Sequence, residues 1–173
     1  MKRWYMLTVV GRDQPGIVAA LADALFRAGV NLGEASMVRL GGSFTIMLMV
    51  ETERDASAIR TILDPAGRSL GLNMHVDLID AQLHSHVEPN VRVTVYGADR
   101  PGIVAQVTAA LASRGFNILD LESDVAGTRE QPIYVMTIDG HCAESATAIE
   151  KLLLPLREKG VEVGAEPLET LVG

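Results

Sequence analysis

Residues 11–19 read GRDQPGIVA, and residues 97–105 read GADRPGIVA. The same offset of 86 residues, half the length of the 173-residue chain, relates the two halves without a gap as far as Asn31 and Asn117. Solenoid repeats are shorter, at roughly 20–50 residues, so this period is that of a whole small domain. The sequence therefore predicts a duplicated domain with a pair of related sites.

The composition is that of a globular protein without a nucleic-acid surface. Apolar residues make up 48% of the chain, which disfavours disorder and supports two small cores. The net charge of −7 argues against direct contact with nucleic acid, because such contact needs clustered Lys and Arg. No apolar run approaches the roughly 20 residues that cross a bilayer, so no membrane contact is expected. Cys142 is the single cysteine and has no internal disulfide partner, which fits a reducing cytoplasm.

Hydrophobic periodicity predicts an alternating order of elements in the first half. Apolar residues recur at helical spacing over Ile17–Ala28, and Gly29 ends that helix. A two-glycine hairpin turn at 41–42 separates two strands. A second helix over Asp55–Leu70 contains Pro65, which is expected to break or bend it. The strands are predicted at Trp4–Val10, Asn31–Leu40, Ser43–Glu51 and Asn73–Ile79.

The second half follows the same order, with four residues added at one turn. Beyond the hairpin the offset grows to 90, so that Phe44 corresponds to Tyr134 and Pro65 to Pro155. The addition falls around 127–131, as expected of an exposed hairpin tip. Pro155 is expected to interrupt the last helix in the way that Pro65 interrupts its counterpart.

Strand, helix, strand, strand, helix, strand is the order of a ferredoxin-like sandwich. The predicted fold class is α+β, with two βαββαβ domains, each a four-stranded antiparallel sheet with helices on one face. Residues 1–82 are expected to form the first domain, 83–90 a polar linker and 91–173 the second domain. His84 and His86 of the linker lack a third metal ligand, so no metal site is assigned there.

The strand Phe44–Val50 is apolar at nearly every position, which fits a strand covered on both faces. Helices on one side of the sheet would leave Met47 and Met49 bare on the other. The domains are therefore expected to pair with each other or with a second chain, through sheet edges or open faces. A homodimer is the expected assembly.

Two interpretations of the repeated Asp-x-Pro-Gly stretch stay open. In the architectural one, Asp13 caps the following helix, Pro15 fixes its first turn and Gly16 allows close backbone approach. In the functional one, the N–H groups at the start of the helix bind the carboxylate of a free amino acid, and Asp13 or Asp99 binds its ammonium group.

The motif Gly-x-Asp-x-Pro-Gly-Ile-Val followed by Gly-x-Asn, on a βαββαβ frame, resembles the ACT domain, and it does so twice. The stretch LGGSFT at 40–45 makes the first copy similar in particular to the glycine cleavage system transcriptional repressor family. ACT domains are regulatory modules that commonly bind amino acids, so the resemblance implies ligand-binding residues near both loops, with Ser36, Ser43 and Thr45 as weaker candidates. The implied ligand-binding residues are Asp13, Pro15, Gly16, Ile17 and Asn31 in the first copy, and Asp99, Pro101, Gly102, Ile103 and Asn117 in the second.

The two loops are not identical. At equivalent positions of the repeat, Arg12 corresponds to Ala98 and Gln14 corresponds to Arg100. The two sites therefore need not share a ligand or an affinity.

Catalysis has little support in the sequence. It contains no recognisable Ser-His-Asp set, metal motif or phosphate loop. The adjacent His141 and Cys142 resemble a Cys–His pair only superficially, because neighbours along a turn need not face each other. No catalytic residue, metal or cofactor is therefore assigned.

The resemblance implies an amino-acid-sensing regulator without a catalytic domain, which acts through a protein partner. That partner would be an activator of glycine cleavage genes, and glycine would be the first ligand to test. Two alternatives stay open: a regulatory subunit of an amino-acid metabolic enzyme, and an interaction module whose loops bind nothing.

Overall fold

The computed structural model describes residues 1–80, 87–98, 101–128 and 132–169 of the chain. The chain divides into two compact units, Met1–Ser85 (domain 1) and His86–Gly173 (domain 2), each with its own sheet. Residues 83–86 of the predicted linker, His84 and His86 among them, lie outside the described residues, and so do Asp99 and Arg100.

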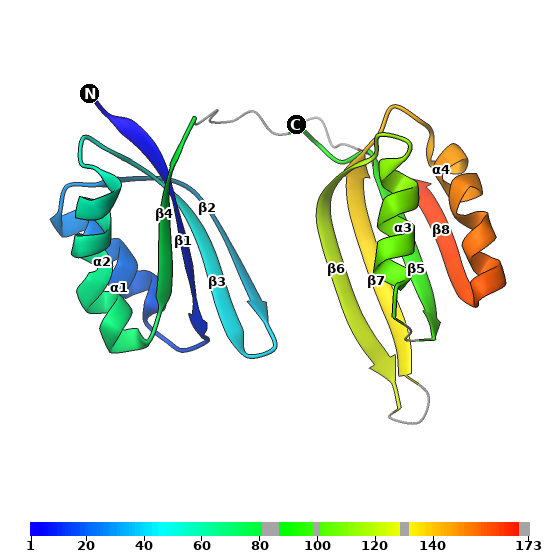
Figure 1. Ribbon diagram of the computed structural model, residues 1–173, viewed down its shortest axis with the longest axis horizontal. Coiled ribbons are helices and arrows are strands. Elements are labelled where there is room, and N and C mark those ends of the chain that lie inside the picture. The colour runs from blue at the N-terminus through cyan, green and yellow to red at the C-terminus, as the bar shows by residue number, and fades with distance from the viewer. Residues whose placement is uncertain (81–86, 99–100, 129–131, 170–173) are drawn as a thin grey trace. The chain divides into compact units, whose positions relative to one another are not determined.

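The two domains contain the same order of strands and helices (Figure 1). Strands and helices are found where they were predicted in the first half, with ends shifted by a few residues. Domain 1 consists of β1 (Arg3–Arg12), α1 (Ile17–Arg27), β2 (Asn31–Leu40), β3 (Ser43–Thr52), α2 (Ala56–Leu70) and β4 (Asn73–Ile79). Domain 2 consists of β5 (Val91–Ala98), α3 (Ile103–Ala112), β6 (Asn117–Gly127), β7 (Pro132–His141), α4 (Ala146–Leu153), the 3₁₀ helix η1 (Leu154–Lys159) and β8 (Val161–Pro167).

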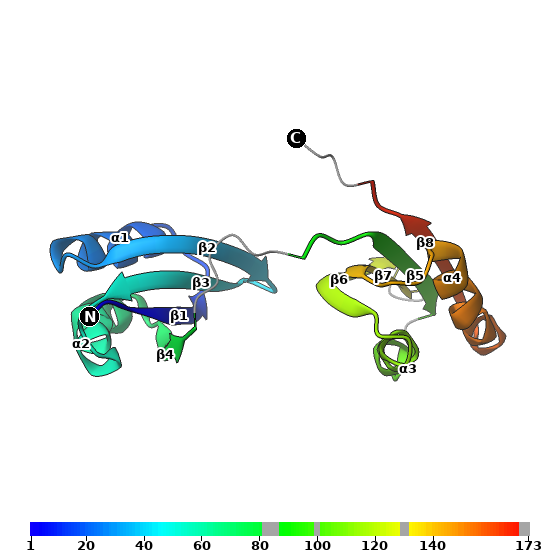
Figure 2. The ribbon, with the colours of Figure 1, turned by 90° about the horizontal axis from the view of Figure 1, so that it is seen from above.

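Each sheet has four antiparallel strands, in the orders β2-β3-β1-β4 and β6-β7-β5-β8. The helices of each domain lie on one face of its sheet (Figures 1 and 2). The predicted pair of ferredoxin-like βαββαβ domains is therefore confirmed. Within the described residues, none of the helices combines the length and apolar character needed to cross a membrane.

Side chains of the central strands alternate between the helices and the open face of each sheet. In β1 and β3 the helix-facing residues are buried, and most of their neighbours along the strand are at least partly exposed. Leu7 and Val50 are 0% exposed, for example, whereas Met47 is 44% exposed. Each helix adds a buried stripe, as Leu21 and Leu25 do for α1. Each domain thus encloses a core of its own.

The two aligned prolines have different effects on their helices. α2 continues through Pro65 as far as Leu70, so Pro65 does not break this helix. Proline has no N–H group, so Pro65 cannot donate to the carbonyl of Thr61, one turn earlier in the helix. Because both residues are exposed, water can donate to that carbonyl instead. In domain 2 the α-helix stops at Leu153 and Pro155 lies in the first turn of η1, which confirms the predicted interruption.

Strand register confirms where the four extra residues lie. Arg39 of β2 is opposite Phe44 of β3, and Val125 of β6 is opposite Tyr134 of β7. Val125 is 86 residues after Arg39 in the sequence, whereas Tyr134 is 90 residues after Phe44. The four added residues therefore lie between Val125 and Tyr134, in the β6–β7 hairpin. In domain 1 the same hairpin is a tight turn at 41–42, where both glycines have positive φ, at 57° and 77°.

The two open faces, meaning the sheet faces without helices, differ in character. That of domain 1 carries several large apolar side chains among polar ones such as Thr8, Thr45 and Asp77, and the charged side chains on that of domain 2 are mainly acidic. The cover predicted for Phe44–Val50 remains a prediction, because Met47 is exposed within the chain. Register assigns Trp4, Met6, Val10, Val38, Leu40, Met47 and Met49 to the first face, and Asp120, Glu122, Asp124, Asp139, Glu162 and Glu166 to the second.

Candidate functional site

The glycine of the repeated motif starts the first helix of each domain. Gly16 is the N-cap of α1 with φ 93°, and Gly102 is the N-cap of α3 with φ 92°. This left-handed conformation favours glycine, because a side chain would clash with the backbone. Because both N-cap residues are glycines, neither N-cap contributes a side-chain hydrogen bond to the first turn. Two parts of the architectural interpretation differ from the structure of domain 1, because Gly16 rather than Asp13 is the N-cap and Pro15 precedes α1, which begins at Ile17.

Asp13 instead connects the loop to the β2–β3 hairpin. Its backbone N–H donates to the Gly42 carbonyl at 3.0 Å, and its Oδ2 lies 2.7 Å from Nε of Arg39. The Asp13 side chain is 30% exposed and that of Arg39 66% exposed, so both charges are open to solvent. The first N–H groups of α1 have no partner within the helix. The loop that precedes these backbone donors therefore carries two opposite charges.

Gln14 fixes the other side of the same loop. Its Nε2 donates to the Leu70 carbonyl at 2.8 Å and so satisfies one of the carbonyls that the end of α2 leaves without a helical partner. The loop of domain 1 is thereby closed against α2. The corresponding residue of domain 2 is Arg100, which lies outside the described residues.

In each domain, the asparagine that follows the first helix in the repeat lies far from the Asp-x-Pro-Gly loop. Asn31 is opposite Glu51, at the far end of β3 from Gly42, and eight residues of extended strand span about 26 Å. There it lines an open hollow of about 380 Å³. Asn117 is likewise opposite His141, away from Gly102. Within one domain, these residues do not share a site with the Asp-x-Pro-Gly loop.

The other predicted site residues have mixed environments. Ile17 is 2% exposed and belongs to the core of domain 1. Ser36 and Thr45 lie on the open face of that sheet, since their pairs on the neighbouring strands are Met47 and Val10.

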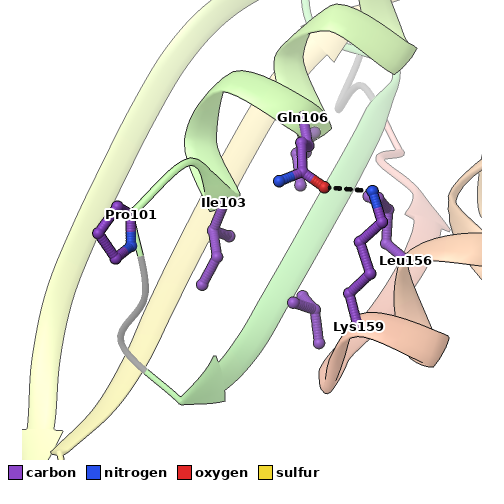
Figure 3. Close-up of a pocket in the computed structure, with 7 residues that line it drawn as sticks. Pro101, Ile103, Gln106, Leu156 and Lys159 are labelled. Carbon is purple, nitrogen blue, oxygen red and sulfur yellow. Dashed lines mark hydrogen bonds between the residues drawn. The ribbon is translucent and has the colours of Figure 1, made fainter.

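Pro101 and Ile103, predicted from the second copy of the motif, line a cavity of about 190 Å³ on the helix side of domain 2 (Figure 3). Its apolar wall also includes Val107 of α3 and Val161 of β8. At its mouth, Nζ of Lys159 donates to Oε1 of Gln106 at 2.7 Å. The remaining lining residue is Leu156 of η1.

The cavity exists because η1 replaces the last turns of the second helix. Arg157 of η1 donates to the Val163 carbonyl at 3.0 Å and so holds this segment against β8. Leu156 and Lys159 then border the space beside α3. In domain 1 the corresponding residues belong to the continuous helix α2.

One further charged pair lies on the open face of domain 2. Arg92 donates to both carboxylate oxygens of Asp139 at 2.7 Å. The hydrogen bond from Arg92 holds the pKa of Asp139 below its usual range, and the same bond raises the pKa of Arg92. This pair supports the sheet and borders no cavity described above.

His141 and Cys142 do not act as a catalytic pair. Nδ1 of His141 lies 3.1 Å from the Glu88 carbonyl, and Sγ of Cys142 lies near the Arg114 carbonyl and accepts from the N–H of Glu144. Cys142 is 2% exposed. In the described part of the chain, no three His, Cys, Asp or Glu side chains gather as metal ligands would.

Sequence reasoning missed Arg39, Gln106 and Lys159. A signal existed for Arg39, because strand alternation places it on the helix-facing side with Met37, where a charge is unusual. Gln106 and Lys159 carried no comparable signal, since both look like ordinary exposed helix residues.

Comparison with known proteins identifies both units. The model of the ACT domain matches residues 5–77 and again 91–153, together more than three quarters of the chain. The UPF0237 protein YjhC of Lactococcus lactis is 42% identical over 72 residues, which are 41% of this chain and 83% of that protein. The glycine cleavage system transcriptional repressor of Escherichia coli is 26% identical over 123 residues, which are 70% of this chain and 65% of that protein. The crystal structure of an unknown protein from Galdieria sulphuraria has a TM-score of 0.77 and 25% identity, covering 98% of this chain and 100% of that one.

The matched segments coincide with the two βαββαβ units. The ACT-domain matches and the relatives from Lactococcus lactis and Escherichia coli identify a regulatory rather than a catalytic protein, which is distantly similar to the glycine cleavage repressor. The chain belongs to the ACT-domain family and carries two ACT domains in tandem.

Proposed function

We propose that the chain is a cytoplasmic amino-acid sensor that passes its signal to a protein partner, and that this partner regulates glycine cleavage genes. The observation that carries the proposal is the Asp13–Arg39 pair, whose opposite charges lie 2.7 Å apart at the loop that precedes α1. Similarity to the glycine cleavage repressor of Escherichia coli over 70% of the chain supports the choice of partner and ligand.

The charges at this loop complement those of a free amino acid. Arg39 and the first N–H groups of α1 can donate to a carboxylate. Asp13 can accept from an ammonium group beside Arg39, because a carboxylate offers about four acceptor positions. Glycine is the first ligand to test, since it needs no side-chain pocket.

The second copy is proposed as a related but unequal site. Asp99 would accept from the ammonium group there, and Gly102 gives α3 the same start as α1. Asn31 and Asn117 lie at the other end of their domains, so they would join a site only if a second chain or domain supplied them.

The direct test is titration of the whole chain with each of the twenty amino acids, followed by thermal unfolding and calorimetry. A ligand at 100 times its Kd is expected to raise the free energy of unfolding by about 2.7 kcal/mol. Absence of stabilisation by every amino acid at millimolar concentrations would leave an interaction module as the better description.

Asp13→Ala is expected to weaken amino-acid binding about 10- to 100-fold, because a hydrogen bond to a charged group contributes about 1.5–3 kcal/mol. Its effect on stability should be about 1 kcal/mol or less, since the Arg39 pair is solvent-exposed. Calorimetry measures the first quantity and urea unfolding the second. Asp23→Ala is the matched control, because it removes another exposed pair, with Arg27, away from the loop. Equal affinities of the two variants would contradict the assignment.

The net charge of −7 favours a protein partner over direct contact with DNA. Purification of the tagged chain from its native cells, with and without glycine, tests this. Recovery of a transcription regulator would support the proposal, whereas recovery of an amino-acid enzyme would favour a regulatory subunit.

We also propose a homodimer in which the open face of domain 1 is covered. Met47→Glu is then expected to weaken self-association at least tenfold, because it would bury an unpaired charge. Sedimentation velocity over a range of concentrations measures the change. Val104→Glu is the control, since Val104 is 40% exposed on α3 and Met47 is 44% exposed. A wild-type chain that sediments as a monomer at high concentration would refute the dimer.

A further inference from the structure

We infer that the cavity beside α3 in domain 2 binds a small carboxylate with a short branched aliphatic chain, of the kind shared by valine and its 2-oxo acid. The inference deepens the proposed function, on which it rests for the expectation that the protein takes up a small metabolite. It names a ligand class for domain 2 that differs from the glycine expected at the Asp13 loop.

The inner wall of the cavity suits an aliphatic group. Ile103, Val107 and Val161 line it and are 7%, 0% and 6% exposed, so this wall belongs to the core of domain 2. Leu156 and Pro101 extend the apolar surface toward the mouth. Each methylene buried here should raise affinity about fourfold. Glycine, which has no side chain, gains nothing from this wall.

The mouth of the cavity suits a carboxylate. The Lys159 ammonium brings a positive charge to it, and its hydrogen bond to Oε1 fixes the orientation of the Gln106 amide (Figure 3). Nε2 of that amide is then turned toward Gly102, where a Cβ would lie 3.4 Å from it. A carboxylate at the mouth can therefore accept from Gln106 Nε2 under the attraction of Lys159.

The size of the cavity limits the ligand to a small molecule. Its volume of about 190 Å³ is well below that of sites for drug-sized ligands. A chain of three or four carbon atoms fits this space. Drug-sized ligands need about 300–1,000 Å³, so a nucleotide or a long acyl chain is too large.

These features belong to domain 2 alone among the described residues. By the repeat offsets, Gln106 corresponds to Ala20 and Lys159 to Ser69, so the equivalent place in domain 1 lacks both polar groups of the mouth. There, too, Gln14 closes the loop against the Leu70 carbonyl. Domain 1 is thus an internal control for the site.

The test uses the full chain and measures ligand-induced changes in backbone amide NMR signals together with calorimetry. Valine and 2-oxoisovalerate are expected to bind at least tenfold more tightly than glycine at this cavity, with shifts at residues 103–107 and 156–161. Valinamide, which lacks the carboxylate, should bind at least tenfold more weakly than valine. Tighter binding of valine than of 2-oxoisovalerate would show that the ammonium group is recognised, and the reverse order would identify the oxo acid as the ligand.

Lys159→Met is expected to lower the affinity for both ligands about 10- to 100-fold while it keeps the aliphatic stem. Lys151→Met, which removes an exposed lysine of α4 outside the cavity, should change neither affinity. The double change Gln106→Ala with Lys159→Ser gives the mouth the residues of domain 1 and should abolish binding without loss of folding, since both side chains are exposed.

The outcomes separate this inference from the proposed function. If glycine shifts residues near Asp13 and no aliphatic carboxylate affects residues 103–107, the inference alone is wrong. If valine or its oxo acid binds in domain 2 but Asp13→Ala leaves every affinity unchanged, the inference stands and the glycine site is wrong. If Lys159→Met and Lys151→Met bind equally well, the cavity is not the site.

Discussion

Gly140→Ala is expected to destabilise domain 2 by about 3 kcal/mol or more, at the upper end of what overpacking a core costs. A Cβ on Gly140 would lie 2.1 Å from Cε1 of Phe116 and 2.5 Å from the backbone oxygen of Asn117. Phe116 is 5% exposed, so its ring has no open space to enter. The carbonyl belongs to the start of β6 and moves only if the strand moves. Urea unfolding of the full chain measures the loss.

Gly164→Ala is the matched control in the same sheet. A Cβ there meets nothing within 4 Å, and Gly164 has no positive φ. The change should therefore be neutral or should stabilise the protein by up to about 1 kcal/mol, because alanine restricts the unfolded chain. Similar stabilities for the two variants would show that the Phe116 contact is not rigid.

Leu63→Ala is expected to destabilise domain 1 by about 2–5 kcal/mol, and Leu153→Ala should do the same in domain 2. Both leucines are 0% exposed, and the offset of 90 makes them equivalent positions of the second helix. Each belongs to a different core cluster. Thermal unfolding should therefore show one transition lowered in each variant and the other transition retained.

An exposed leucine provides the control for these two variants. Leu78 is 62% exposed and pairs with Tyr5, away from the open face, so Leu78→Ala should change stability by no more than about 0.5 kcal/mol. If Leu63→Ala and Leu153→Ala each lowered both transitions by the same amount, the two domains would unfold as one cooperative unit.

The fold could be predicted because local signals and the repeat agree. Glycines at 41–42 and at 71 marked a hairpin and a helix end through backbone conformations that other residues avoid. The offset change from 86 to 90 located an added segment that strand register then confirmed. The continuation of α2 through Pro65 could not be predicted, because sequence alone does not tell whether the carbonyl that loses its donor faces water or the core.

The site was less predictable, because its contacts join residues far apart in the sequence. Asp13 looked like a helix cap, and only the paired strands reveal that Arg39 reaches it from the hairpin. Asn31 shares the motif with Asp13 in sequence, but a strand length separates them in space. Lys159 and Gln106 meet because η1 turns beside α3; Pro155 marked the helix interruption, but no short-range pattern tells which residues of η1 reach α3.

Because Cys142 is buried, the reactivity of the only thiol of the chain reports on the opening of domain 2. At 2% exposure, Sγ can react with an alkylating reagent only while this domain is open, so the labelling rate records how often it opens. The only indole, that of Trp4, belongs to domain 1, where it packs over Gly33. Alkylation and indole emission can thus follow the two halves separately in one sample, without any engineered probe.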